Sequence, residues 1–331
     1  MKKILVFGGN KFLGKNIIEQ IQIKMPSAQI YSLTRSGIQE DKVKENKNLK
    51  YLKCDRTSPS ELEKTLRDLG TDKFDFVFDA SAYQPEVLEP SVNVLKKRVG
   101  TSGTWAFVSS AGVYAKTERF PIEADFPKVN SQPQPTPHWG KLQCEELLKS
   151  QAGLHTFCIR PFYIYGPENT FDRESFFFRS LESGKDILVP DDGKALLQFA
   201  SVRDVASLFV DLALLSKEQT QHKAFHAADK TVHTINSFIQ TCAKVVGKEA
   251  KLKYFSVEEA KKEGFQLRDI FPLRAEHYFG DVQDLENLGL QASNDLEQGL
   301  RKTYDWFKQN RDLYPKHFMT EAGERFLLAL K

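Results

Sequence analysis

The sequence has no run of apolar residues long enough to cross a membrane. Its longest such runs, among them "KILVFGG" and "FDFVFDA", have the length of a strand and fall far short of about 20 residues. No basic segment followed by an apolar one precedes the first strand-like run, so the sequence shows no secretory signal. We therefore expect a cytoplasmic protein that is not bound to a membrane.

Cysteine is scarce, and histidine forms no clear metal-binding cluster. The four cysteines lie far apart and form no CxxC pair, which argues against a zinc site and against a disulfide framework. His222 and His226 have the spacing of metal ligands on a helix, in "HKAFH". The stretch "KAFHAAD", however, has the character of a short buried strand, on which that spacing means little. We predict no metal site.

The chain also lacks a strong excess of charge of one sign. It has 47 lysine and arginine residues against 44 aspartate and glutamate residues, a net charge of +3. A dedicated nucleic-acid-binding domain usually has a larger excess or a clear basic stripe. Lysines do cluster in "DKVKENKNLKYLK" and "LKKR", either as a solvated face or as a surface for phosphates. Charge alone therefore decides little about an RNA partner.

Short apolar runs alternate with amphipathic segments through the first half of the chain. Strand-like runs occupy residues 2–7, 28–34, 49–53, 74–80, 104–110 and 155–161, and helix-like stretches lie near 12–24, 58–69, 86–98 and 140–151. In "SPSELEKTL", Ser, Pro and Glu stand where a helix start favours them. Such alternation predicts βαβ units. The expected fold class is α/β, a doubly wound parallel (Rossmann) sheet that binds ligands beyond the carboxyl ends of its strands.

The pattern loosens after about residue 166, where a loop-rich insertion with one helix begins. In it, "SFFFRSL" predicts a buried helix. "SVRDVASLFVDLALL" returns to a strong helical period, and polar helices and loops follow from about residue 231. We assign residues 1–165 and about 199–230 to a dinucleotide-binding Rossmann domain. Residues 166–198 and 231–331 form a smaller C-terminal lobe that binds the substrate or partner.

A glycine-rich turn, in "VFGGNKFLGK", follows the first strand and opens the first helix. Its glycines fit a strand–turn–helix at which a pyrophosphate sits on the helix N-terminus. The usual fingerprint has a middle glycine where this chain has Lys11, which either obstructs a dinucleotide or pairs with its phosphate. The alternative is a purely structural turn. The candidate cofactor-binding residues here are Gly8, Gly9, Lys11, Phe12, Leu13 and Gly14.

The end of the second strand bears on the choice of cofactor. NAD-binding folds usually have an acidic residue there for the ribose hydroxyls, but this chain has Arg35, in "YSLTRSG". Arginine cannot accept a hydroxyl proton but pairs well with a 2′-phosphate, so we expect NADP, with NAD as the alternative. After the third strand, "CDRT" brings Asp55 and Arg56 to where an adenine would lie. Arg56 is a cofactor contact or an ordinary surface charge.

Two further motifs bring polar side chains to strand ends. "FVSSAGVYA" puts Ser109 and Ser110 at the carboxyl edge of the sheet, where a hydroxyl can hydrogen-bond a substrate oxygen. "PTPHWGKLQCEELL" is a loop that breaks into a helix, with Lys141 near its start. A catalytic lysine here needs an acid–base partner about one turn upstream, where the residue is Pro137, which carries no proton. An unperturbed imidazole titrates near neutrality, so the adjacent His138 is the substitute candidate.

Four more residues are candidates for contact with a substrate or partner. "IRPFYIYGP" contributes Arg160 and Tyr163, and "VRDVA" and "IFPLRAEHYFG" contribute Arg203 and Arg274. Each arginine could bind a phosphate or serve as a structural ion-pair partner, and the sequence leaves both roles open.

Taken in order, these motifs resemble the extended short-chain dehydrogenase/reductase family of nucleotide-sugar epimerases and dehydratases. GGxxFxG, SSAGVY, KxxxEELL, RPFYIYGP and VRDVA follow the family order over nearly the whole chain. Within this family, the sequence looks most like the atypical branch of chloroplast stem-loop-binding proteins. That branch shares the basic residue in the glycine turn, the SSAGVY motif, a histidine and GK in place of the tyrosine–lysine segment, and a late FPxR motif.

The resemblance implies roles for the candidate catalytic residues. In catalytic relatives, a tyrosine four residues before the lysine is the general acid–base. The lysine lowers the pKa of that tyrosine and holds the nicotinamide ribose, while a serine polarises the substrate. Ser110 and Lys141 match by position and are the candidate catalytic residues together with His138, but Pro137 replaces the tyrosine. Losing such a group costs about 10²–10⁴ in rate, so we expect a site kept for binding and impaired for hydride chemistry.

Two functions therefore stay open, and the sequence does not decide whether the chain is an enzyme. One is an NAD(P)-dependent nucleotide-sugar epimerase, dehydratase or reductase with an altered acid–base group. The other, implied by the atypical branch, is an RNA-binding, ribosome-associated protein with endonuclease activity. A plastid-bearing source would place the protein in an organellar stroma. A purely structural partner protein and assembly into a homo-oligomer are compatible with the same residues.

Overall fold

The computed structural model describes residues 1–37, 47–129, 137–169, 171–293, 295–314 and 318–329. By their contacts the residues fall into two units, each built from three segments. Unit 1 comprises Met1–Phe162, Arg203–Ala227 and Asp281–Gln291, and unit 2 comprises Tyr163–Val202, Ala228–Gly280 and Ala292–Lys331. The sequence assigns residues 281–291 to the C-terminal lobe, whereas their contacts group them with unit 1.

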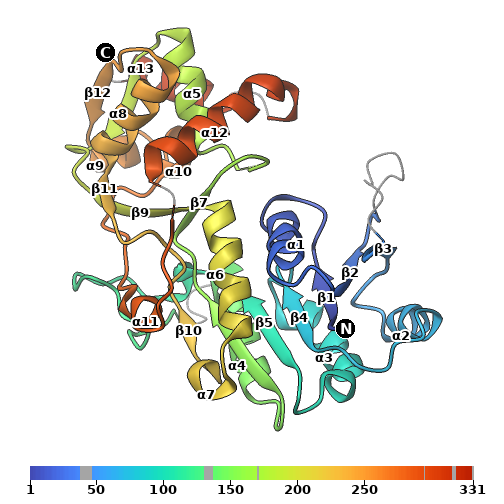
Figure 1. The fold of residues 1–331 in the computed structure, drawn as a ribbon. Coiled ribbons are helices and arrows are strands. Elements are labelled where there is room, and N and C mark those ends of the chain that lie inside the picture. Colours follow the sequence, from blue (N-terminus) through green and yellow to red (C-terminus); the bar gives the residue numbers. More distant parts are fainter. Residues whose placement is uncertain (38–46, 130–136, 170, 294, 315–317, 330–331) are drawn as a thin grey trace. The chain divides into compact units, whose positions relative to one another are not determined.

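Unit 1 is built on a seven-stranded parallel sheet. Its strands are β1 (Lys3–Phe7), β2 (Gln29–Thr34), β3 (Leu49–Lys53), β4 (Phe76–Asp79), β5 (Thr104–Val108), β6 (His155–Ile159) and β10 (Ala224–Phe225). They lie in the order β10-β6-β5-β4-β1-β2-β3, and every neighbouring pair is parallel (Figure 1). The strand order reverses between β1 and β4, which is the doubly wound arrangement. The predicted α/β fold class is confirmed.

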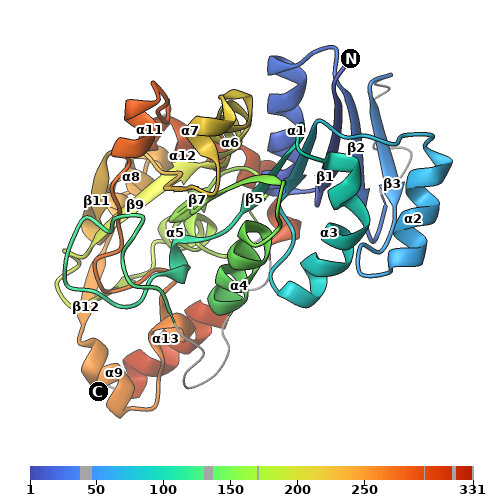
Figure 2. The same ribbon diagram turned by 90° about the horizontal axis from the view of Figure 1, so that it is seen from below.

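Helices cover both faces of this sheet (Figure 2). On one face, α2 (Pro59–Asp68), α3 (Pro85–Val99) and α4 (Pro137–Lys149) pack over a core that contains Trp105 and Phe107. On the other face lie α1 (Phe12–Lys24) and α6 (Val202–Leu214), and Phe209 of α6 contacts Phe78 and Phe157 edge-on. The short helices α7 (Lys217–Thr220) and α11 (Gln283–Asn287) and the 3-10 turn η2 (Ala111–Val113) also belong to unit 1. Because both faces are covered, the central strands are continuously apolar.

Two helix starts show how local sequence sets the element boundaries. The hydroxyl of Ser58 accepts a hydrogen bond from the Glu61 N–H and caps α2, whose first residue is Pro59, as "SPSELEKTL" predicts. α4 begins at Pro137, whereas the sequence predicts a start near residue 140. Proline is favoured at the first helical position because its missing N–H would have no helical partner there. Lys141 consequently lies one full turn inside the helix.

Unit 2 contains two small sheets and a set of helices. Strands β7 (Tyr163–Tyr165), β9 (Leu196–Ser201) and β11 (Val232–Thr234) pair in the order β11-β9-β7, and β8 (Ile187–Pro190) pairs with β12 (Leu252–Phe255). The helices are α5 (Glu174–Ser183), α8 (Ile235–Val246), α9 (Val257–Lys262), α10 (Leu267–Ile270), α12 (Leu296–Gln309) and α13 (Phe318–Ala329), with a 3-10 turn at Arg311–Leu313. The three phenylalanines of "SFFFRSL" are buried in α5, as predicted. Among the described residues, no helix has both the length and the apolar character that a membrane crossing needs.

Candidate functional site

The glycine-rich turn joins β1 to α1 at the carboxyl end of a central strand of unit 1. Gly8 has a φ of +86°, which residues with a side chain rarely adopt, and its N–H donates to the Leu33 carbonyl at 3.1 Å. A Cβ at Gly14 would lie 2.0 Å from the Gly8 carbonyl oxygen, so the first turn of α1 touches the loop backbone. Lys11 is the exposed N-cap residue of α1 and makes no side-chain cap hydrogen bond. The side chain of this N-cap residue therefore does not compete with an anion for the first N–H groups of α1.

The other residues of the turn fix α1 against the sheet. A Cβ at Gly9 would lie 2.4 Å from the Ser32 hydroxyl. Phe12 opens α1 with a positive φ of 41°, and the side chain of Leu13 is buried. Packing within the protein thus fixes the backbone of the turn, and no ligand is needed to shape it.

Arg35 and Asp55 lie at the carboxyl ends of the neighbouring strands β2 and β3. The Asp55 carboxylate accepts hydrogen bonds from the Thr57 N–H at 2.9 Å and the Thr57 hydroxyl at 2.7 Å. These bonds lower the pKa of Asp55, and the nearby charge of Arg35 lowers it further. The Arg35 side chain is exposed, and in the described part of the chain no hydrogen bond or ion pair holds its guanidinium. The proposed contacts of Arg35 and Asp55 with a cofactor stay predictions.

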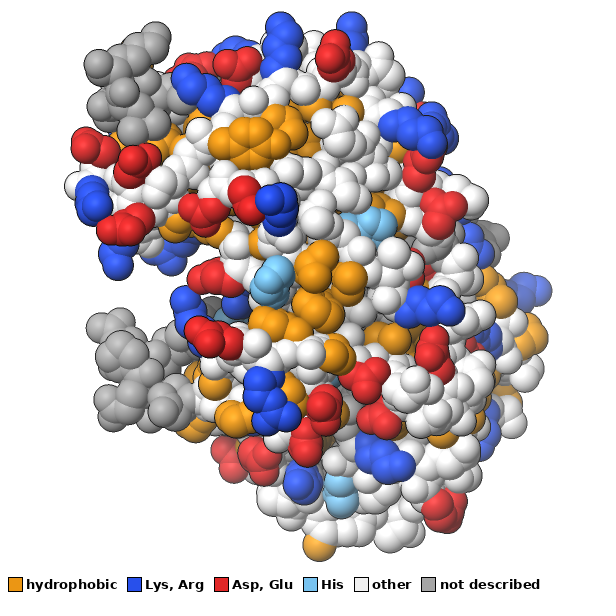
Figure 3. Space-filling model, turned by 90° about the vertical axis from the view of Figure 1, so that its left-hand side faces the viewer, with side chains coloured by type: hydrophobic (Ala, Val, Ile, Leu, Met, Phe, Trp, Pro, Cys, Tyr) orange, Lys and Arg blue, Asp and Glu red, His pale blue; other side chains and the backbone are white. Residues whose placement is uncertain are grey.

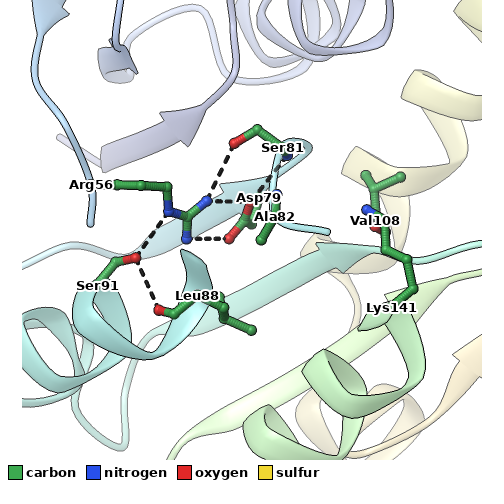
Figure 4. Close-up of polar contacts among 8 residues, drawn as sticks. All are labelled: Arg56, Asp79, Ser81, Ala82, Leu88, Ser91, Val108 and Lys141. Atoms are coloured by element: carbon green, nitrogen blue, oxygen red, sulfur yellow. Dashed lines mark hydrogen bonds and ion pairs between the residues drawn. The ribbon is translucent and has the colours of Figure 1, made fainter. Parts of the chain in front are cut away.

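Arg56 is buried, and its guanidinium binds both oxygens of Asp79 at the end of β4 (Figure 4). The two terminal nitrogens donate to the Asp79 carboxylate at 2.7 and 2.6 Å, and Nε donates to the Ser91 hydroxyl at 3.0 Å. The guanidinium also donates to the Ser81 hydroxyl at 3.3 Å and stacks on the Phe7 ring at 3.9 Å. Arg56 is therefore an internal ion-pair partner and not a surface charge. Its contact with a cofactor stays a prediction.

Asp79 is a residue of this site that the sequence analysis missed. Its carboxylate accepts hydrogen bonds from the N–H groups of Ser81 and Ala82 at 3.1 and 3.2 Å and so fixes the loop after β4. Burial raises the pKa of Asp79, but the charge and hydrogen bonds of Arg56 outweigh that effect and hold the pKa below its ordinary value. An acidic residue at the end of the apolar run "FDFVFDA" was the signal, because a buried carboxylate needs a partner.

Lys141 is buried, with 4% of its surface exposed, and its ammonium lies among β5 and the loop after β4. Nζ donates to the Val108 carbonyl oxygen at 2.6 Å, and it lies over the rings of Tyr83 and Phe107, 4.2 and 4.9 Å from their centroids. Burial lowers the pKa of Lys141 to about 8, and the negative charge of Asp79 opposes that shift. Tyr83 is the second residue that the sequence analysis missed, and no motif pointed to it.

Ser110 and His138 meet at the turn η2. The Ser110 hydroxyl accepts a hydrogen bond from the Gly112 N–H at 3.0 Å. The His138 ring packs against Gly112, since a Cβ there would lie 2.2 Å from Nδ1 of the imidazole. The neighbouring Ser109 is buried, and its hydroxyl has no hydrogen-bond partner among the described residues. The serine motif and the first turn of α4 therefore converge at the carboxyl end of β5, where Lys141 also binds.

Arg160 is held by a second buried carboxylate in unit 1. Nε and one terminal nitrogen donate to Glu145 at 3.0 and 2.5 Å, and the other terminal nitrogen donates to the Tyr114 hydroxyl and the Ala124 carbonyl. The Tyr114 hydroxyl and Nε2 of His226 are 2.6 Å apart, so this histidine is a buried partner that follows the short strand β10. A phosphate contact by Arg160 would have to replace one of these bonds, and it stays a prediction.

The remaining candidates lie in different units. Arg203 is exposed at the start of α6 in unit 1. Tyr163 and Arg274 belong to unit 2, where the Tyr163 hydroxyl accepts a hydrogen bond from the Arg274 N–H at 3.0 Å. The Arg274 guanidinium stacks on Tyr278, 4.1 Å from the ring centroid. The structure thus brings Tyr163 and Arg274 together. Among the residues that it describes, no cluster of three or more His, Cys, Asp or Glu side chains is placed to hold a metal ion.

Comparisons with known proteins identify the family. The model of the NAD dependent epimerase/dehydratase family matches residues 4–228. The chain is 30% identical over 315 residues to the chloroplast stem-loop binding protein of 41 kDa b of Arabidopsis thaliana, covering 92% of this chain and 79% of that protein.

Solved structures agree on the fold. A dTDP-glucose 4,6-dehydratase from Bacillus anthracis in complex with NAD is 17% identical, with a TM-score of 0.74, covering 95% of this chain and 99% of that one. A UDP-glucose 4-epimerase from Thermotoga maritima with UDP-glucose is also 17% identical, with a TM-score of 0.72, covering 93% and 99%. The chain belongs to the NAD dependent epimerase/dehydratase family.

Proposed function

We propose that this chain binds a nicotinamide dinucleotide on unit 1 and acts on or binds a nucleotide sugar. The observation that supports this most directly is the turn before α1, where the helix begins at the carboxyl end of a central strand and without a side-chain cap. That combination suits the close approach of a pyrophosphate. The Bacillus anthracis dehydratase binds NAD and the Thermotoga maritima epimerase binds UDP-glucose, which favours the same ligand classes here.

Different residues of unit 1 would bind different parts of the dinucleotide. Gly8, Gly9, Lys11, Phe12, Leu13 and Gly14 would hold the pyrophosphate, Arg35 the 2′-phosphate of NADP, Asp55 and Arg56 the adenine side, and Lys141 the nicotinamide ribose. When bound, the nicotinamide supplies a hydride donor or acceptor. Arg35 makes NADP the preferred form, because a guanidinium pairs with a phosphate and cannot accept the proton of a ribose hydroxyl.

The proton-transfer part of the site is altered. Ser110 can donate a hydrogen bond to a substrate oxygen, and the Lys141 ammonium can bind a hydroxyl, but Pro137 has no proton to give. His138 is the titratable side chain beside the serine motif, packed against Gly112. We propose that His138 takes the place of the absent acid–base group incompletely, so that hydride chemistry is slower by about 10²–10⁴ than with a well-placed group.

Turnover of common nucleotide sugars tests this directly. The purified chain is incubated with UDP- and dTDP-sugars and NAD or NADP, and products are identified by mass spectrometry. We expect no turnover at rates ordinary for such enzymes, and loss of any residual turnover in His138→Ala. The control is His222→Ala, which changes an exposed histidine elsewhere in unit 1. Robust turnover that survives His138→Ala would contradict the proposal.

The ligand that stays bound through purification gives an independent test. Mass spectrometry of the denatured protein solution identifies it without any assumption about activity. NADP(H) or a UDP-sugar would support the proposed function, and co-purifying RNA would support the alternative.

RNA binding is the second candidate, because the chain resembles a stem-loop binding protein over 92% of its length. On the face that Figure 3 shows, Lys and Arg side chains are interspersed with Asp and Glu and form no large patch of one sign. The sequence also shows no aromatic-rich RNA-binding signature such as an RRM core motif, so any RNA contact is expected to depend on phosphate charge and not on base reading. Binding of a stem-loop should then fall steeply as salt rises, which a titration at several salt concentrations measures. Binding that is sequence-selective and insensitive to salt would contradict this expectation.

A further inference from the structure

Among the described residues, three groups contact the Lys141 ammonium, and they differ in how much they can move. The Val108 carbonyl and the Phe107 ring belong to β5, inside the sheet, and Phe107 is 0% exposed. The third group, the Tyr83 ring, comes from the loop between β4 and α3 and is 51% exposed. Of these three groups, only Tyr83 lies largely at the surface, and it alone can turn away without disturbing the sheet.

The backbone that bears Tyr83 is fixed. The Asp79 carboxylate binds the N–H groups of Ser81 and Ala82 just before it. Helix α4 packs against this loop, since a Cβ at Gly140 would lie 2.3 Å from the Tyr83 carbonyl oxygen. α3 begins at Pro85, two residues further on. Movement of Tyr83 is therefore a rotation of its side chain, and the loop itself stays in place.

The Tyr83 ring leaves little of the ammonium accessible. Lys141 is 4% exposed, although it lies one turn from the start of α4. One of its N–H groups is bound to Val108, and two aromatic faces flank the rest. A positive charge over aromatic faces is attracted to them, so the arrangement is stabilising in the absence of a ligand. A hydroxyl that binds Nζ must first replace the Tyr83 ring.

We propose that Tyr83 is a binding determinant of this site: its ring covers the Lys141 ammonium and must rotate away before a ribose or sugar hydroxyl can bind Nζ. The inference rests on the proposed function, in which Lys141 contacts a ribose. It adds that the affinity for that ligand is lower than it would otherwise be, because binding has to displace the Tyr83 ring.

Removing the ring should make Lys141 both more reactive and a better ligand site. For Tyr83→Ala we expect acetylation of Lys141 to become severalfold faster and NADPH to bind about twofold to thirtyfold more tightly, the range given by the strength of cation–π contacts. Tyr83→Ser should behave alike. Tyr83→Phe keeps the ring and should match the wild type in both measurements. Tyr254→Ala is the matched control, because Tyr254 is 50% exposed and belongs to unit 2.

The experiment follows acetylation of the intact chain at pH 8 by a water-soluble acetylating reagent, with peptide mass spectrometry. At that pH a substantial part of Lys141 is neutral, because burial lowers its pKa to about 8, so the rate reports access. Lys149 on the same helix is exposed and serves as the internal standard. NADPH affinity of the same variants is measured by fluorescence titration.

The outcomes separate this inference from the proposed function. Unchanged acetylation of Lys141 in Tyr83→Ala overturns the covering role, whatever the nucleotide does. Faster acetylation with weaker NADPH binding also overturns it, because Tyr83 would then be part of the ligand site. Faster acetylation with no nucleotide binding in any variant supports the covering role and overturns the proposed function. Faster acetylation with tighter NADPH binding supports both.

Discussion

The glycine-rich turn and the start of α4 contribute the two parts of the proposed site on unit 1, and substitutions affect them differently. The turn is specified by space: a side chain at Gly14 would meet the Gly8 carbonyl oxygen at 2.0 Å. The first position of α4 has to be compatible with a helix, and proline satisfies that condition. A proton-transfer group can therefore be lost while every element stays in place. Ligand binding and proton transfer are separable properties in this fold.

The largest effect is expected from the buried pair that supports the loop beside the turn. Asp79→Asn removes the charge that neutralises Arg56 and leaves that arginine buried without a counterion. We expect a loss of about 3–5 kcal/mol in the free energy of unfolding, measured by urea denaturation. Such a loss would show that the pair that holds the loop after β4 is also needed for the stability of the fold.

The control for Asp79→Asn is Glu63→Gln, whose ion pair with Arg98 is partly exposed. That change should alter the free energy of unfolding by no more than about 1 kcal/mol. Equal effects of the two substitutions would mean that the buried pair has no special role.

A smaller effect, of up to about 3 kcal/mol, is expected from Lys141 on the α4 side. Its pKa is lowered from 10.5 to about 8 by burial, so between these values the unfolded chain binds more protons than the folded one. The free energy of unfolding contributed by this group therefore increases as the pH rises from about 8 to 10.5. The difference between wild type and Lys141→Met, measured by denaturation across this range, isolates the effect from other titrating groups. Parallel pH profiles would contradict the lowered pKa.

The smallest of the three effects concerns the choice of cofactor on the turn side. A charge-assisted contact of Arg35 with the 2′-phosphate contributes about 1.5–3 kcal/mol, which corresponds to a preference for NADP over NAD of roughly 10- to 150-fold. Arg35→Ala should abolish this preference in titrations with NADPH and NADH. Lys11→Ala is the companion variant, expected to change both affinities alike because the pyrophosphate is common to both. A preference that persists in Arg35→Ala would show that another residue discriminates.

The sequence predicted the architecture of unit 1 well, because the central strands of its sheet are buried on both faces and are largely apolar. The run at 104–110 contains β5 (Thr104–Val108), and the run at 155–161 contains β6 (His155–Ile159). The weak strand β10 was also expected from "KAFHAAD".

Side-chain partners could not be predicted in the same way. Arg56 pairs with a carboxylate 23 residues away and Arg160 with one 15 residues away, and both arginines had seemed equally suited to a ligand. Their partners depend on which strand and helix ends meet in three dimensions, which hydrophobic periodicity does not encode. For the same reason nothing in the sequence connected Tyr83 with Lys141.

The order of segments in unit 1 bears on how the chain folds during synthesis. The first segment ends at Phe162 with six strands, but the edge strand β10, the helix α6 and the segment Asp281–Gln291 are made later. At about 5–20 residues per second, a ribosome needs roughly 6–26 s to synthesise the chain from Phe162 to Gln291. In the meantime the nascent sheet exposes the apolar face that Phe209 later covers and an unpaired strand edge. We expect aggregation, where it occurs, to begin in this interval, before the later segments cover the sheet.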